Sequence, residues 1–189
     1  MLCLLILVFA GLWTAKNFSL NSSFSVGQPI DSLNGVKVYY NGEVGNVSGR
    51  NLSADNYNLG VKYQCVEFIK RYYFEHLKHK MPDSHGNAKD YFDRSLPDGS
   101  LNKKRDLKQF DNPSKTKPKI DDIIVFSETN FNKFGHVAIV SNVMDNEIEI
   151  IQQNPGKYGK SRKTISLDKE NGKWKLDNKR ILGWLRKEE

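Results

Sequence analysis

The second half of the chain carries a series of short β-type segments separated by turn residues, and this pattern restricts the fold more than any other feature. The segments are rich in β-branched and aromatic side chains, which favour strands. The expected strands are residues 120–126, 134–143, 147–153, 162–167, 172–176 and 181–185. A compact polar turn at 144–146 joins two of them, and Asn171-Gly172, a dipeptide suited to positive φ, joins two others. An antiparallel sheet is therefore expected.

The first half of the chain contains one clear helical pattern. From Cys65 to about residue 78, apolar side chains recur at spacings of three and four, which predicts an amphipathic helix with one apolar stripe. The stripe consists of Val66, Ile69, Tyr73 and Leu77. Lys70, Arg71 and Glu75 lie off this stripe. Residues 87–92 are predicted to form a second, shorter helix.

The order of these elements indicates the fold class. Helices come first and an antiparallel sheet follows, which is an α+β arrangement. The polar residues 45–58 and the charged, proline-containing residues 97–119 are interpreted as loops. A chain of 189 residues that is 38% apolar is sufficient for one hydrophobic core, so we expect a single domain over residues 29–189.

The N-terminal segment is apolar but short. Residues 1–15 contain no charged side chain, yet a membrane-spanning helix needs about 20 apolar residues. The length suits the apolar part of a secretory signal, although no Lys or Arg precedes it and no clean cleavage site follows. We therefore expect a signal or a membrane anchor, with a buried element as the alternative. Residues 16–28 are predicted to be a linker, and the protein to be secreted, periplasmic or membrane-anchored.

The net charge of +7 favours anionic partners such as cell-wall polymers, nucleic acid or membrane surfaces. Residues 157–189 contain 11 Lys or Arg and 5 Asp or Glu, so most of the excess lies in this region. A basic hairpin there can hold an anionic wall polymer, or it can be a solvated face. No alternation of aromatic and basic residues accompanies the charge, so we expect no nucleic-acid partner.

Cys65 and His136 are the candidate catalytic pair. A helix N-terminus offers free N–H groups and the positive end of the helix dipole, which lower the pKa of a thiol from about 8.5. His136, at the head of a strand, is the best candidate for a base that takes the thiol proton. Gln152 and Asn154 are two residues apart, on one face of a strand, and either amide oxygen can orient the imidazole.

Each of these residues also has a plain structural interpretation. A lone cysteine is more often a core residue, and a histidine at a strand start is usually a polar edge residue. The other histidines, His76, His79 and His85, lack carboxylate or cysteine companions at firm spacing. We therefore expect no metal and no cofactor, and a monomeric protein.

Two motifs resemble the CHAP family, the cysteine, histidine-dependent amidohydrolases and peptidases. Gln-Cys-Val-Glu-Phe at residues 64–68 is similar to the family's nucleophile motif, especially the version in the amidase domain of glutathionylspermidine synthetase/amidase. Gly-His-Val-Ala-Ile-Val at residues 135–140 is similar to its histidine strand. Residues 120–126 resemble the preceding strand, with Asp121 where the family usually has Gly. The similarity runs from about residue 36 to residue 186.

The resemblance implies a papain-like fold in which N-terminal helices pack on the sheet and Cys65 attacks an amide carbonyl. His136 would act as base and then acid, and water would release a thioester intermediate. The backbone N–H of Cys65 and the side chain of Gln64 would hold the oxyanion. Many family members have Glu where this chain has Gln152, whereas Asn154 matches the family. An amide orients imidazole without stabilising its charged form, so lower activity or a shifted pH optimum is expected.

Three functions remain open from the sequence. The first is hydrolysis of amide bonds in cell-wall peptidoglycan, which accounts for the apolar N-terminus and the basic charge. The second is an amidase similar to glutathionylspermidine amidase, acting on a small peptide amide, which the nucleophile motif favours. The third is a non-enzymatic binding module with the same fold, suggested by Gln152 alone.

Overall fold

The structure is a computed structural model that describes residues 24–156 and 159–188. The predicted signal or anchor at residues 1–15, and most of the predicted linker, lie outside the described residues. Within the described part of the chain, no helix is long and apolar enough to cross a membrane.

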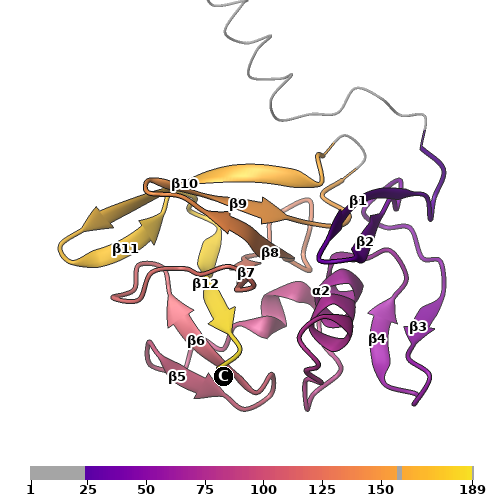
Figure 1. The fold of residues 1–189 in the computed structure, drawn as a ribbon, viewed down its shortest axis with the longest axis horizontal. Helices are drawn as coiled ribbons and strands as arrows, with labels where there is room; N and C mark the ends of the chain where they lie inside the picture. Colours follow the sequence, from indigo (N-terminus) through magenta and orange to yellow (C-terminus); the bar gives the residue numbers. More distant parts are fainter. Residues whose placement is uncertain (1–23, 157–158, 189) are drawn as a thin grey trace, which may run out of the picture.

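The described residues form one α-helix packed against an eight-stranded antiparallel sheet, with two small hairpins beside the helix (Figure 1). The helix is α2 (Cys65–Glu75), and a 3₁₀ turn, η1, follows it at Ala88–Tyr91. The hairpins are β1 (Pro29–Leu33) with β2 (Val36–Tyr39), and β3 (Arg50–Leu52) with β4 (Asn58–Val61). In the large sheet the strand order is β11-β10-β9-β8-β7-β12-β6-β5.

The large sheet contains all six strands that the sequence predicts in the second half of the chain. Its strands are β5 (Ser100–Asn102), β6 (Leu107–Asp111), β7 (Ile123–Phe126), β8 (His136–Val143), β9 (Glu147–Ile151), β10 (Arg162–Glu170), β11 (Lys173–Leu176) and β12 (Ile181–Arg186). Asn171 and Gly172 have φ values of 51° and 76° between β10 and β11, as their turn chemistry predicts.

Two predictions about the first half of the chain are wrong. The α+β class stands, but helices do not come first, because four strands precede α2, which is the sole α-helix of the described chain. The intervals 45–58 and 97–119 are not loops throughout, since they contain β3, the start of β4, β5 and β6. These strands are three to five residues long, too short for an alternating pattern to stand out among charged residues.

Side chains alternate between the two sides of the large sheet and form two separate cores. On the helix side, Ile123, Val125 and Ile139 pack with aromatic residues of α2. The other side is enclosed by the sheet itself, because Trp174 of β11 forms a bridge with Ser114, in the loop after β6. The sheet therefore curls around its second core and presents its first core to the helix.

Asp121 shows why glycine is usual at its position in the family that the sequence resembles. Its φ is +72°, a left-handed conformation that favours glycine. The hydroxyl of Tyr72 donates to the Asp121 carboxylate, and the hydroxyl of Tyr73 donates to the Asp121 carbonyl at 2.8 Å. The strained residue is thus tied to α2 by two hydrogen bonds.

Candidate active site

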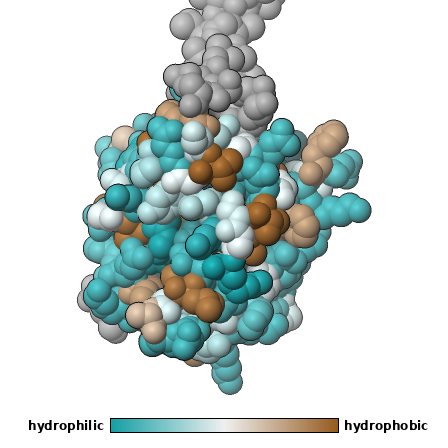
Figure 2. Space-filling view, turned by 90° about the vertical axis from the view of Figure 1, so that its right-hand side faces the viewer, coloured by the Kyte–Doolittle hydropathy of each residue, from teal (hydrophilic) through white to brown (hydrophobic). Residues whose placement is uncertain are grey.

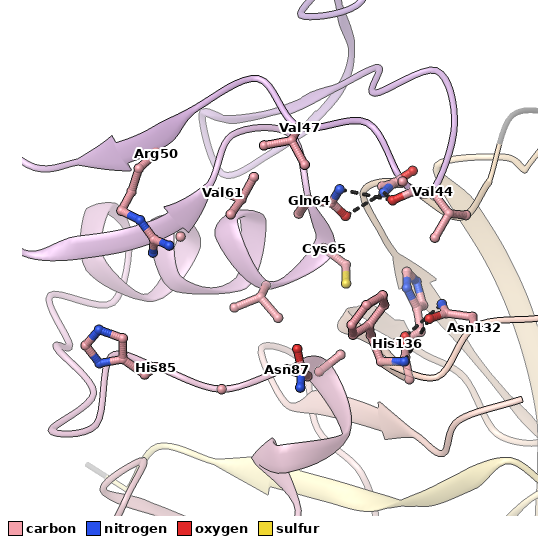
Figure 3. A pocket seen from close by; sticks show the side chains of 18 of the residues that line it. Val44, Val47, Arg50, Val61, Gln64, Cys65, His85, Asn87, Asn132 and His136 are labelled. Carbon is pink, nitrogen blue, oxygen red and sulfur yellow. Dashed lines mark hydrogen bonds between the residues drawn. The ribbon is translucent and has the colours of Figure 1, made fainter.

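A groove with a cavity volume of about 450 Å³ runs past the start of α2. Cys65 and His136 both line it, together with Gln64 and Asn154. Figure 3 shows the Cys65 sulfur at the end of the helix and His136 on the facing strand, at the same end of the groove. The structure therefore brings together four residues that the sequence spreads over 91 positions, from 64 to 154.

Cys65 is the first residue of α2, and the preceding Gln64 has an extended backbone. The thiol is half-buried, and loss of hydration raises its pKa to about 11. Hydrogen bonds from the backbone N–H groups of Val137, Val66 and Cys65 act in the opposite direction but do not compensate. The expectation of a lowered thiol pKa is therefore wrong, because desolvation outweighs the helix N-terminus. At neutral pH the resting sulfur is a thiol.

His136 is held by Gln152. The His136 Nε2 lies 2.9 Å from Gln152 Oε1, while Gln152 Nε2 donates to the carbonyl of Lys160 at 2.9 Å. Since the amide nitrogen is occupied by a carbonyl, the amide oxygen faces the ring and accepts the hydrogen of Nε2. The other ring nitrogen, Nδ1, therefore carries a free lone pair, as a base for a thiol requires.

Burial also sets the charge of His136. Desolvation lowers its pKa to about 4, the Gln152 bond opposes this, and the positive charge of Arg180 adds to it. The imidazole is thus neutral at neutral pH. Position 135, just before His136, has room for glycine alone, because a Cβ there would lie 2.7 Å from the Phe126 carbonyl oxygen. The Gly-His motif therefore has a physical basis in the close approach of neighbouring backbone.

Asn154 contacts Gln64 rather than the imidazole. Asn154 Nδ2 donates to Gln64 Oε1 at 2.7 Å. The amide nitrogen of Gln64 in turn donates to the carbonyls of Val44 and Asn46 at 3.0 and 2.7 Å. Of the two residues considered as orienting groups, Gln152 makes the contact. A place for Gln64 in the oxyanion hole stays a prediction, and it would require one of these carbonyl bonds to be exchanged.

A buried polar network connects the helix to the segment that holds His136. Gln153 is fully buried, and its Nε2 donates to the Gln64 carbonyl at 2.9 Å and to Glu67 Oε2 at 2.8 Å. Glu67 Oε1 accepts from Arg71 Nε at 2.7 Å and from Asn51 at 2.8 Å. Three consecutive residues therefore hold the site together. Gln152 fixes the imidazole, Gln153 fixes the start of the helix, and Asn154 fixes the side chain of Gln64.

This network was missed in the sequence. Glu67 and Arg71 both lie off the predicted apolar stripe, yet they are 1% and 6% exposed. Their spacing of four positions is the available signal, because it places opposite charges side by side on a helix.

The remaining histidines lie apart from one another. His79 is buried, with its Nε2 2.9 Å from the Arg105 carbonyl, while His76 contacts Asn34 and His85 lines the far end of the groove. Over residues 24–156 and 159–188, no group of three side chains is placed to hold a metal ion.

The CHAP domain profile matches residues 55–154, an interval that contains all five candidate residues and more than half of the chain. The chain belongs to the CHAP family. This CHAP chain is also similar to parts of several longer proteins. The bifunctional glutathionylspermidine synthetase/amidase of Escherichia coli (strain K12) is 30% identical over 142 residues, covering 69% of this chain and 23% of that protein.

Two Crithidia fasciculata proteins are similar at the same level. Glutathionylspermidine synthase is 31% identical over 137 residues, 67% of this chain and 19% of that protein. Trypanothione synthetase is 29% identical over 107 residues, 57% of this chain and 16% of that protein. The CHAP chain thus spans less than a quarter of the length of these relatives.

Among solved structures, that of Ly7917 matches 40% of this chain and 30% of its own, at 22% identity and a TM-score of 0.28.

Proposed function

We propose that this CHAP domain is a cysteine amidohydrolase in which Cys65 is the nucleophile and His136 the general base. The observation that carries the proposal is the groove that both residues line, with the imidazole fixed by Gln152 at 2.9 Å. The hydrogen on Nε2 leaves Nδ1 free to accept the thiol proton.

The charge states favour a concerted start to the reaction. As sulfur attacks the amide carbonyl carbon, the proton of the neutral thiol passes to Nδ1 and a carbon–sulfur bond forms. The oxyanion is stabilised by the Cys65 backbone N–H, which lies in the first turn of α2 and has no carbonyl acceptor within the helix. The imidazolium then gives its proton to the departing nitrogen, and the carbon–nitrogen bond breaks.

The second half of the reaction releases the acyl group. Water attacks the thioester carbon and gives one proton to Nδ1, the carbon–sulfur bond breaks, and the proton returns to sulfur. Gln152 orients the ring in both halves but supplies no negative charge to stabilise imidazolium, which a Glu would supply. A modest turnover rate is the expected consequence.

Peptide amides of cell-wall peptidoglycan are the first proposed substrate. The net charge of +7 favours association with an anionic polymer, and the apolar residues 1–15 suit a protein that is exported or held at a membrane. The groove is open enough for a peptide, and no Asp or Glu is among its lining residues. Both properties suit an extended, anionic substrate.

The test is digestion of purified sacculi by the full chain, with released fragments identified by mass spectrometry. New amino and carboxyl termini at one kind of amide bond are expected, and none with Cys65→Ala. Intact sacculi after incubation with folded wild-type protein would contradict the peptidoglycan proposal.

Glutathionylspermidine is the second candidate substrate, because the similarity to the Escherichia coli synthetase/amidase covers 69% of this chain. Its hydrolysis to glutathione and spermidine is measured by chromatography with the same two proteins. Cleavage of this compound without release from sacculi would favour the second candidate. Failure to cleave either substrate would favour a binding module.

A further inference from the structure

The groove has a cationic end opposite the cysteine. Figure 3 shows Arg50 and His85 near one end, while Cys65 and His136 lie at the other. All four line the same cavity. Arg50 is the one Lys, Arg, Asp or Glu among the described residues that line the cavity.

The guanidinium of Arg50 is available to a ligand. Arg50 is exposed, in β3, and pairs across the hairpin with Val61. Its Nη1 donates to Asn58 Oδ1 at 3.0 Å. That is its single side-chain hydrogen bond within residues 24–156 and 159–188, so most of the five N–H donors of the guanidinium remain free. An arginine held at one nitrogen keeps its position while it presents the other nitrogens to the groove.

Two buried cations lie behind this end of the groove. Lys70 and Arg105 are each 1% exposed. Lys70 donates to the carbonyls of Asn58, in β4, and of Ser84, and Arg105 donates to the carbonyls of Asp83 and His85. Neither forms an ion pair with a described carboxylate.

The pKa of Lys70 responds both to burial and to the neighbouring positive charges. It is lowered to about 8, first by burial and then by the charges of Arg105 and Arg50. The nearby Asp83 carboxylate accepts from the His85 backbone at 2.9 Å, lies 3.9 Å from His85 Nδ1 and raises the pKa of Lys70, but it does not line the groove. Arg50 itself forms no ion pair within the described residues, so its positive charge lies at the groove without a carboxylate partner.

We propose that this end of the groove is a subsite for a free carboxylate of the substrate, with Arg50 as the residue that contacts it. The inference rests on the proposed function, because it assumes that a peptide amide lies between Cys65 and Arg50. A guanidinium fork matches the geometry of a carboxylate and can donate two parallel hydrogen bonds. The preferred substrates are then peptides with an unmodified carboxylate at a fixed separation from the cleaved bond.

Apolar side chains also line the groove. Figure 2 shows the face that carries β3 and β4, where hydrophilic atoms surround several separate hydrophobic patches. Val47 and Phe134 line the groove and are 74% and 61% exposed. They offer contact to the aliphatic part of a peptide whose carboxylate reaches Arg50.

A matched pair of peptides tests the subsite. The probes are L-Ala-γ-D-Glu-L-Lys, with a free α-carboxylate on the glutamate, and the same peptide with that carboxylate replaced by a carboxamide. Calorimetric titration of the Cys65→Ala protein measures binding without hydrolysis. The acid is expected to bind about 10-fold to 100-fold tighter than the amide, since hydrogen bonds to charged groups have that value. Equal affinities would overturn the subsite.

Substitution of the arginine assigns the preference to its source. With Arg50→Gln added, the preference for the acid is expected to disappear, and with Arg50→Lys to be partly retained. Lys163→Gln, an exposed residue of β10 that does not line the groove, removes the same charge and should leave the preference unchanged. A preference that survives Arg50→Gln in folded protein, shown by an unchanged melting temperature, contradicts the assignment.

Hydrolysis of the same peptides by the wild-type protein separates the two proposals. Binding that depends on Arg50 without hydrolysis would uphold the subsite and count against the amidohydrolase. Hydrolysis of acid and amide at equal rates would uphold the amidohydrolase and overturn the subsite.

Discussion

The two sides of the large sheet are built differently. The side enclosed by the curled sheet is an apolar core, formed by residues such as Ile124, Val140, Ile148 and Trp184. The side against α2 also has an apolar core, but Glu67 and other charged or amide side chains are buried next to it. The candidate active site lies at the edge of the helix side of the sheet.

The difference shows how side chains are held in place on each side of the sheet. Apolar contacts are non-directional and give stability in proportion to the area removed from water. Hydrogen bonds fix distances, and the bonds from Gln152, Gln153 and Asn154 set the imidazole against the helix start. Substitutions on the enclosed side should therefore change stability alone, whereas those on the helix side should also change activity.

The largest expected effect is that of His136→Ala on amide hydrolysis. Loss of the base should lower kcat/KM by about 1000-fold, since general base catalysis contributes up to about 10⁴-fold. Steady-state kinetics on whichever peptide amide the wild type cleaves measures this, with circular dichroism as the control for folding. Retention of a tenth of the activity would mean that another group is the base.

Glu67→Leu should cause the next largest effect, a loss of about 3 kcal/mol or more in the free energy of unfolding. The substitution leaves the buried Arg71 without its carboxylate, and breaking a buried pair costs about 3–5 kcal/mol. Urea denaturation measures the change. Glu75→Leu, at the exposed end of the same helix, is the matched control and should lose far less.

If Glu67→Leu and Glu75→Leu lower the free energy of unfolding equally, the buried polar network does not stabilise the helix side, and the contrast with the enclosed side fails.

Gln152 allows a smaller and more specific test. Gln152→Ala should lower kcat by about 10-fold to 100-fold, because the ring loses the acceptor that fixes its orientation. Gln152→Glu places a negative charge beside the ring and raises the pKa of His136 from about 4. Because the base acts when neutral, the acidic limb of the kcat/KM profile should move to higher pH. An unmoved limb would exclude His136 as its source.

The smallest expected effect lies on the enclosed side. Ile148 is fully buried there, and Ile148→Val should cost about 1 kcal/mol of stability by removing one methylene. Activity at 25 °C should not change. A change in kcat larger than twofold would show that the enclosed side is coupled to the groove, and that the contrast between the two sides is incomplete.

The sequence predicted strands β7 to β12 well, because β-branched and aromatic residues are concentrated in them and turn residues separate them. The pairing of β8 with β9, and the Asn171-Gly172 turn, depend on residues within a few positions of each other. Cys65 and His136 were predicted as a pair from local signals, and the structure places both in one groove. Their catalytic roles stay predictions.

The helix side was predicted less completely, because its polar contacts join distant segments. Lys70 and Arg71 lie off the apolar stripe of α2, and they are buried because segments beyond the helix supply their partners. Arg71 donates to the Lys37 carbonyl, and Lys70 to carbonyls at 58 and 84. The thiol pKa was also predicted in the wrong direction, since helix position is local whereas desolvation depends on the whole fold.

The measurement that tests the central claim most directly is alkylation of Cys65 by iodoacetamide at pH 7, in the wild type and in His136→Ala. Peptide mapping by mass spectrometry reads Cys65 separately from Cys3. Since burial keeps the sulfur protonated at this pH, its reaction requires a base, and the rate should fall at least about 10-fold when His136 is removed. Equal rates in the two folded proteins would contradict the pairing of thiol and imidazole.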